Sequence, residues 1–129
     1  MKTSWDITGK TVLILGAQGL VGSALVRRLD QEDCNVIAAT RAQADLTDAK
    51  QTADYIQSIN PDAIFLSAAK VGGILANRDY PVDFLEANLL IQLNVLRAAH
   101  DENVERVVFW DLPVFTPNSQ SNLSRKRAY

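Results

Sequence analysis

Residues 11–22 decide the fold, and they read TVLILGAQGLVG. The first five of them, 11–15, form a short and almost entirely apolar run, which is typical of a parallel strand buried on both faces. Gly16, Gly19 and Gly22 follow at regular spacing, and a helical pattern begins inside the same stretch. We therefore predict a strand, a tight glycine turn and a helix in direct succession.

A glycine turn between a strand and a helix fits the binding of a dinucleotide cofactor. The first glycine permits the tight turn, the second lets the backbone reach the pyrophosphate, and the third lets the helix pack close to the strand. Free N–H groups at the start of the helix then bind the phosphate charge. A glycine-rich turn without a ligand is the alternative. The predicted pyrophosphate-binding residues are Gly16, Ala17, Gln18, Gly19, Leu20, Val21 and Gly22.

Beyond this stretch, apolar runs alternate with helical patterns up to about residue 110. We predict further strands over 34–39, 63–66 and 107–110, and helices over 20–29, 48–59 and 81–100. The order β-α-β-α-β-α-β predicts an α/β fold of Rossmann type with a parallel sheet.

The three helices carry more specific expectations. The first should bury a stripe that contains Leu20, Ala24, Leu25 and Leu29. Asp48 is a suitable N-cap for the second, which should end at Asn60-Pro61-Asp62. The third is apolar over so wide an arc that we expect it to pack on the sheet and on something else, such as a partner subunit.

The end of the second predicted strand indicates which cofactor is bound. NAD-dependent enzymes usually place an acidic residue there to hold the ribose 2′-hydroxyl. This chain has no acid at that point and carries Arg41, whose guanidinium suits a 2′-phosphate. NADP is therefore predicted, with Arg41 as a solvated surface charge as the alternative. Asp45 and Leu46 follow at the spacing where such folds contact the adenine.

The segment after the third predicted strand carries a family resemblance. Residues 66–77 read LSAAKVGGILAN and residues 80–84 read YPVDF; 20–27 (LVGSALVR) and 45–48 (DLTD) fit the same pattern. Over about residues 11–109 the chain resembles the GDP-L-fucose synthase family of extended short-chain dehydrogenases/reductases. Those enzymes are NADP-dependent epimerase-reductases that convert GDP-4-keto-6-deoxymannose to GDP-L-fucose.

The resemblance implies several site residues and partners. It places the cofactor against the glycine turn, Arg41 and the residues Ala68, Ala69 and Lys70. Some family members carry an arginine where Gln18 stands, which implies a weaker phosphate contact here. It also implies a GDP-sugar substrate for a full-length form and a homodimer. Without the helix that completes the family's dimer interface, we expect this chain to be marginally stable and prone to associate.

The resemblance stops near residue 110. The family continues with Gly-Ser-Ser-Cys-Ile-Tyr-Pro and later a Tyr-x-x-x-Lys helix, which supply its catalytic groups. Here Leu112 and Val114 stand at the serine and cysteine positions, and Tyr129 is the last residue. We therefore predict no catalytic residue and no metal ligand in this chain, with residues 1–110 as the NADP-binding half and 111–129 as an irregular, disordered tail.

A shift of reading frame accounts for the tail. When residues 109–129 are back-translated with suitable codons and read one nucleotide out of register, they give Leu-Gly-Ser-Ser-Cys-Ile-Tyr-Pro-Lys-Phe and further family-like sequence. The choice of codon is free at wobble positions, whereas the amino acids largely fix the first two bases of each codon. Our hypothesis is that residues from about Trp110 onward are a frameshifted reading of a normal gene.

Length and composition exclude several classes of protein. The 129 residues suit one domain, and the net charge of −2 argues against a role in binding nucleic acid or an anionic membrane. No apolar run approaches the roughly 20 residues of a membrane span. The N-terminus does not resemble a secretory signal, so a cytoplasmic location is expected. The single cysteine, Cys34, cannot form an internal disulfide.

Two other functions stay open at this point. One is a non-enzymatic NADP-binding module with a genuine interaction tail, which only the basic cluster Arg125-Lys126-Arg127 favours. The other is a fragment of a different nucleotide-sugar reductase or epimerase.

Overall fold

The computed structural model describes residues 4–69 and 78–110. Within these residues, four strands alternate with the helices α1, α2 and α4, and all strand pairs are parallel, in the order β2-β1-β3-β4. The strands are β1 (Thr11–Leu15), β2 (Asn35–Ala39), β3 (Ala63–Leu66) and β4 (Arg106–Phe109). The helices are α1 (Leu20–Leu29), α2 (Ala49–Ile59) and α4 (Pro81–Asp101). The predicted α/β fold of Rossmann type is confirmed.

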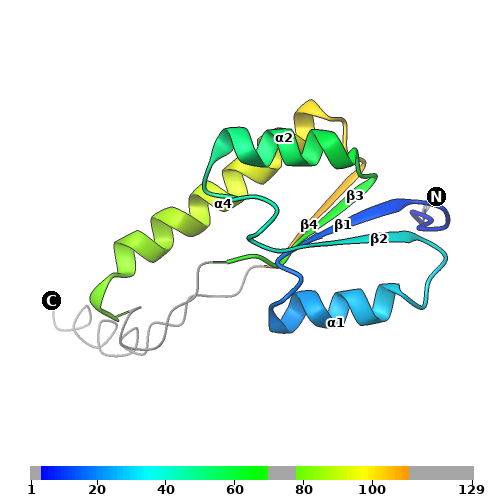
Figure 1. Ribbon diagram of the computed structural model, residues 1–129, viewed down its shortest axis with the longest axis horizontal. Coiled ribbons are helices and arrows are strands. Elements are labelled where there is room, and N and C mark those ends of the chain that lie inside the picture. The colour runs from blue at the N-terminus through cyan, green and yellow to red at the C-terminus, as the bar shows by residue number, and fades with distance from the viewer. Residues whose placement is uncertain (1–3, 70–77, 111–129) are drawn as a thin grey trace, which may run out of the picture.

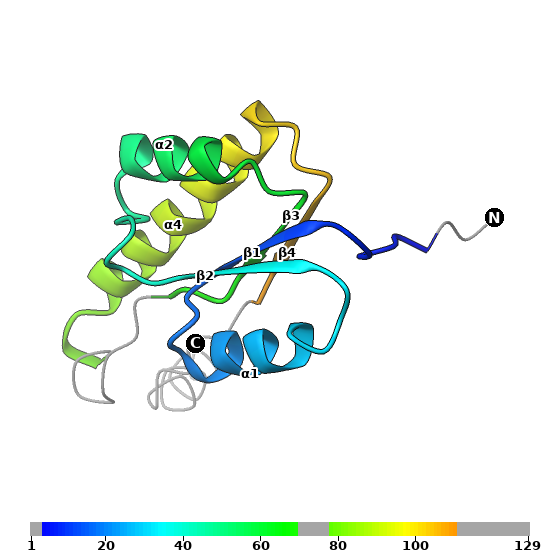
Figure 2. The same ribbon diagram turned by 45° about the vertical axis from the view of Figure 1, so that its right-hand side comes forward.

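The sheet forms the middle layer of the molecule. Helix α1 covers one of its faces, and α2 and α4 cover the other (Figures 1 and 2). Strand β1 lies inside the sheet, and its side chains alternate between the two layers as period-two geometry requires. Leu13 and Leu15 join the core under α2 and α4, whereas Val12 and Ile14 join the core under α1. The continuous apolar run of β1 therefore serves two cores.

The residues predicted to begin and end α2 do so in the structure. The Asp48 carboxylate accepts a hydrogen bond of 2.9 Å from the Gln51 N–H, which caps the helix start. Asn60 ends the helix in the left-handed region, at φ 48°. Two predicted strands were wrong by one residue: β2 begins at Asn35 rather than Cys34, and both ends of β4 (Arg106–Phe109) lie one residue before the predicted 107–110.

The predicted buried stripe of α1 is confirmed at Leu25 and Leu29, which belong to or pack against the core on this face of the sheet. It is wrong in the first turns of the helix. Leu20 was expected on the buried stripe, yet its side chain is 89% exposed, and Ala24 is exposed as well. Gly22 and Leu29 are the buried residues of this helix, because Gly22 allows the backbone of α1 to approach the sheet. The apolar stripe therefore runs through Gly22, and Leu20 lies outside it.

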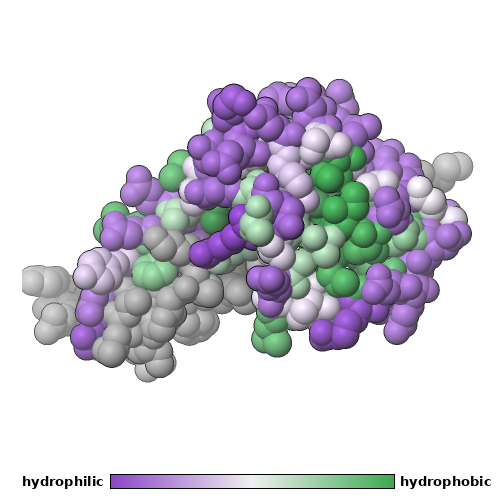
Figure 3. All heavy atoms as spheres, viewed as in Figure 1, coloured by the Kyte–Doolittle hydropathy of each residue, from purple (hydrophilic) through white to green (hydrophobic). Residues whose placement is uncertain are grey.

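Helix α4 packs on the sheet with one face only. Its amino-terminal half extends past the carboxyl ends of the strands (Figure 1). The outward face carries exposed apolar side chains, and hydrophobic residues are visible along it and over the strands in Figure 3. The expectation of a wide apolar arc is confirmed, and the packing of its outward face on something besides the sheet stays a prediction. These exposed side chains are Val82, Leu85, Leu89, Leu90, Leu93 and Leu96.

A second apolar surface lies on the α1 side of the sheet, beside that helix. It is a hollow lined by Trp5, Ala63, Phe65, Arg106 and Val108. Parallel sheets are normally covered on both faces, and among the described helices only α1 lies on this side. None of the helices in the described part of the chain has the length and hydropathy needed to cross a membrane.

Candidate functional site

The predicted site residues meet at the carboxyl edge of the sheet. Because β2, β1 and β3 are adjacent and parallel, the segments that follow them emerge side by side. The glycine turn follows β1, Arg41 and the Asp45–Leu46 pair follow β2, and Ala68 and Ala69 follow β3. This edge is where parallel α/β sheets place their ligands. Lys70 lies outside the described residues.

Two glycines of the turn allow an unusually close approach of three backbone segments. Gly16 has φ +88°, and a Cβ at this position would lie 2.5 Å from the Ala68 nitrogen. A Cβ at Gly22 would lie 2.0 Å from the Gly16 carbonyl oxygen. Gly19 is different, because the nearest atom to its Cβ would be the Gly16 oxygen at 3.4 Å. Gly16 and Gly22 are therefore required by packing, whereas a Cβ at Gly19 would make only this one contact.

Backbone hydrogen bonds hold the turn in place. The Gly16 and Ala17 N–H groups donate to the Ala39 carbonyl of β2, at 3.1 and 3.0 Å. The Gly16 carbonyl accepts from the Gly19 N–H at 3.1 Å. Helix α1 begins directly after Gly19 and has neither a side-chain cap nor an acidic residue in its first turn. Its amino end thus presents uncapped N–H groups, the arrangement that binds an anion.

The turn after β2 exposes Arg41. The Thr40 N–H and hydroxyl both donate to the Gln43 side-chain oxygen, at 2.7 and 2.8 Å, and this fixes the turn. Arg41, which lies between Thr40 and Gln43 in the chain, is exposed. Within residues 4–69 and 78–110 it has no ion-pair partner within 4 Å. Its guanidinium is therefore available to a ligand at the edge of the sheet.

The Asp45 side chain is held by hydrogen bonds to its neighbour Thr47. Its carboxylate accepts hydrogen bonds from the Thr47 hydroxyl at 2.7 Å and the Thr47 N–H at 3.0 Å. These two bonds lower the pKa of Asp45, and the charge of Arg41 lowers it further. The Asp45 N–H in turn donates to the Gln51 side chain at 3.2 Å, which ties the loop to α2.

Sequence reasoning missed one residue of this region. Asn94 of α4 donates a 2.9 Å hydrogen bond from its side-chain nitrogen to the Leu46 carbonyl. It lies between the buried residues Ile91 and Val95. A polar residue so close to the buried stripe of a helix was the available signal, because such a group needs a hydrogen-bond partner.

Chemistry beyond ligand binding is not visible in the described part of the chain. Residues 4–69 and 78–110 contain no group of three or more His, Cys, Asp or Glu side chains that could hold a metal ion. Tyr55, a partly buried residue of α2, has its pKa raised by burial. The positions of the family's serine–cysteine motif, around Leu112 and Val114, lie outside the described residues, as does the rest of the tail.

Comparisons with known proteins agree with this geometry. The model of the NAD dependent epimerase/dehydratase family matches residues 12–111. The chain is similar to the GDP-L-fucose synthase of Sinorhizobium fredii, with 37% identity over 95% of this chain and 39% of that protein. It is also similar to the GDP-L-fucose synthase of Escherichia coli, with 41% identity over 76% of this chain and 31% of that protein.

A solved structure extends the likeness to a cofactor complex. The GDP-mannoheptose C4 reductase from Campylobacter jejuni with NADP bound superposes with a TM-score of 0.73 and 31% identity, over 82% of this chain and 33% of that chain. The present chain thus spans between 31% and 39% of the length of these relatives. The family match covers most of the chain, and so the chain belongs to the NAD dependent epimerase/dehydratase family.

Proposed function

We propose that this chain is the NADP-binding part of a nucleotide-sugar epimerase-reductase of the GDP-L-fucose synthase type. The observation that carries the proposal is the glycine turn. Gly16 and Gly22 let β1, α1 and the end of β3 approach so closely that a Cβ would collide with backbone atoms. The amino end of α1 beside them is uncapped. A cradle of bare backbone N–H groups at this edge of a parallel sheet fits a pyrophosphate.

The residues around the turn have separate roles in this proposal. The backbone from Gly16 to Gly22 binds the pyrophosphate, and the Asp45–Leu46 segment contacts the adenine. Arg41 binds the 2′-phosphate, which favours NADP over NAD. Ala68, Ala69 and Lys70 border the cofactor after β3. NADPH, when bound, supplies a hydride, and the role of these residues is to bind and orient the NADPH molecule.

The substrate class comes from the relatives. Two are named GDP-L-fucose synthases, which favours conversion of GDP-4-keto-6-deoxymannose to GDP-L-fucose by a full-length form. A second candidate is reduction of a different GDP-sugar, because the Campylobacter jejuni relative is a GDP-mannoheptose reductase of comparable similarity. In both cases we propose that residues 1–110 bind the cofactor and that the catalytic groups lie outside this chain.

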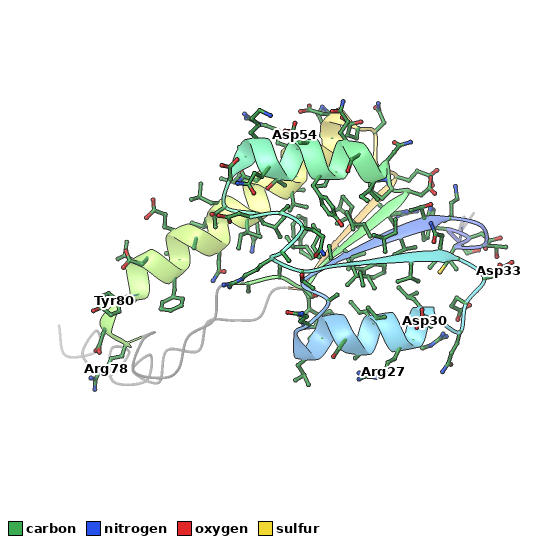
Figure 4. All side chains as sticks on the ribbon, viewed as in Figure 1. Arg27, Asp30, Asp33, Asp54, Arg78 and Tyr80 are labelled. Carbon is green, nitrogen blue, oxygen red and sulfur yellow. The ribbon has the colours of Figure 1, made fainter. Side chains whose placement is uncertain are left out.

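A titration with reduced cofactor tests this function. NADPH fluorescence, measured with the 129-residue chain, is expected to show saturable binding that is tighter than the binding of NADH. Arg41→Ala should weaken NADPH about ten-fold, the lower end of a charge-assisted hydrogen bond, and leave NADH unchanged. Arg27→Ala is the matched control, since Arg27 projects from α1 away from the sheet (Figure 4). Absence of saturable NADPH binding would contradict the proposal.

The origin of the tail is a separate hypothesis with a separate test. We propose that residues from about Trp110 onward are a frameshifted reading of a gene for a complete reductase. Sequencing the coding DNA from the Phe109 codon to well past the stop after Tyr129 decides the matter. Another frame that runs through Ser-Ser-Cys and reaches Tyr-x-x-x-Lys is the expected result. Codons that do not permit this second frame would mean that the tail is genuine.

A further inference from the structure

The Ser67 hydroxyl lies at the junction of three elements of the candidate site. Ser67 follows β3 directly, and its own N–H donates to the Leu15 carbonyl at 2.9 Å. Its hydroxyl also reaches the Leu15 carbonyl, at 2.9 Å, and the Gly16 carbonyl, at 3.3 Å. A Cβ on Gly22 would lie only 2.8 Å from the Ser67 oxygen. The hydroxyl thus touches the end of β1, the glycine turn and the first turn of α1.

This position gives Ser67 influence over the peptide group between Gly16 and Ala17. The N–H side of that peptide donates to the Ala39 carbonyl at 3.0 Å. Its carbonyl side accepts from the Gly19 N–H at 3.1 Å and lies within reach of the Ser67 hydroxyl. Rotation of the peptide would break these contacts. The orientation of this peptide determines where the following N–H groups of the turn point.

We propose that Ser67 is a positioning residue, which holds the glycine turn in the form that binds a pyrophosphate. The proposal rests on the cofactor site proposed above and deepens it. Ser67 acts through the turn: its one hydroxyl hydrogen is shared between the Leu15 carbonyl, at 2.9 Å, and the more distant Gly16 carbonyl, at 3.3 Å. No contact of its own with the ligand is required. Nothing in the sequence pattern distinguishes this serine from a small residue that merely allows close approach.

The substitution Ser67→Ala separates positioning from general stability. The Leu15 carbonyl keeps the backbone N–H of residue 67, and the Gly16 carbonyl keeps the Gly19 N–H. No buried acceptor is therefore left without a donor, and the fold should be retained. What is lost is the restraint on the turn, so the effect should appear in the binding of ligands that carry a pyrophosphate.

Two ligands and one control variant complete the experiment. NADPH contains the pyrophosphate, whereas adenosine 2′-monophosphate contains only the adenine, ribose and 2′-phosphate. Ser58→Ala is the control, because the Ser58 hydroxyl also donates to a backbone carbonyl, that of Tyr55, at 2.7 Å. Ser58 lies near the end of α2 that leads into the start of β3, at the opposite end of the strands from the glycine turn. Dissociation constants come from NADPH fluorescence and from NMR shifts for the nucleotide, and the melting temperature is recorded for each variant.

Ser67→Ala is expected to weaken NADPH about five-fold, the equivalent of one ordinary hydrogen bond of about 1 kcal/mol. Binding of adenosine 2′-monophosphate should stay unchanged, and the melting temperature should fall by no more than about 5 °C, the usual effect of losing one hydrogen bond from a folded domain of this size. Ser58→Ala should alter neither dissociation constant. If Ser67→Ala binds NADPH within two-fold of the unsubstituted chain, or loses equal affinity for both ligands, the proposed role of Ser67 is overturned, while the proposed NADP-binding function is not. Failure of the unsubstituted chain to bind NADPH would overturn the proposed function and the role of Ser67 together.

Discussion

Among the glycines of the turn, Gly22 is the one at which an added Cβ would make the shortest contact, so we expect Gly22→Ala to disrupt the packing of the turn. The added Cβ would lie 2.0 Å from the Gly16 oxygen and 2.7 Å from the Gly16 carbonyl carbon, both backbone atoms that cannot rotate away. To reach an ordinary contact of 3.4 Å, α1 and the turn would have to separate by about 1.4 Å. Overpacking of this kind costs about 3 kcal/mol, which lowers the melting temperature of a domain of this size by roughly 10 °C.

Gly19→Ala is the matched control for that change. Its Cβ would meet only the Gly16 oxygen, at 3.4 Å, and its φ of −71° suits any residue. The loss of stability should stay within about 1 kcal/mol, the usual range for replacing a helix N-cap. The affinity for NADPH should nevertheless fall at least ten-fold, because the second glycine of such a turn is the one at which the pyrophosphate approaches the backbone.

Thermal unfolding followed by circular dichroism, together with NADPH titration of both variants, distinguishes the two effects. Gly22→Ala should lose stability and binding, and Gly19→Ala should lose binding with little change in melting temperature. The reasoning is refuted if Gly22→Ala melts within 2 °C of the unsubstituted chain, since the close approach of α1 to the turn would then be incorrect.

Three further properties follow from the structure. Replacing both Leu89 and Leu93 by glutamine should reduce self-association in sedimentation velocity with little loss of stability, because their side chains are 48% and 62% exposed; unchanged association would show that the outward face of α4 is not the contact. The Trp5 indole N–H donates to the Glu105 carboxylate at 2.7 Å, and this bond and the ion pair with Lys10 lower the pKa of Glu105. As the pH is lowered, the Trp5–Glu105 contact should therefore persist to the ordinary glutamate pKa of about 4.3 and be lost only below it. The indole N–H signal in NMR reports this loss, and its disappearance at a higher pH would contradict the assignment. Burial raises the pKa of the Cys34 thiol, so alkylation by iodoacetamide at pH 7 should be slower than for free cysteine and should accelerate towards high pH; a rate equal to that of free cysteine would contradict the burial.

Much of the fold could be predicted because its signals are local. The apolar run 11–15, the capping carboxylate of Asp48 and the left-handed Asn60 each act within a few residues of their own position. Boundaries of β2 and β4 moved by one residue, because strand ends depend on pairing with neighbours rather than on composition. The buried stripe of α1 was predicted correctly at Leu25 and Leu29 but not at Leu20 and Ala24. A glycine, which has no apolar side chain to reveal it, occupies the buried position 22 instead.

The arrangement of the candidate site was predictable only in outline. The positions of the glycine turn and Arg41 after predicted strands indicated a cofactor site, and the family resemblance implied that Ala68 also borders it. The contacts of Ser67 with β1 and of Asn94 with the loop after β2 join residues about 50 positions apart in the chain, and no local pattern encodes them. Such contacts depend on the register of the strands and the placement of α4, which are properties of the assembled fold.

The central claim is that the edge of the sheet beyond β1 and β2 binds NADP through the glycine turn. Amide chemical-shift mapping of the ¹⁵N-labelled chain with NADP⁺ tests it most directly. The largest shifts are expected at the amides of Gln18 to Gly22 and around Arg41, with none at Gly9 or Glu105 on the opposite edge of the sheet. Saturation with shifts confined to another surface, such as the hollow beside Trp5, or no shifts at all, would contradict the account.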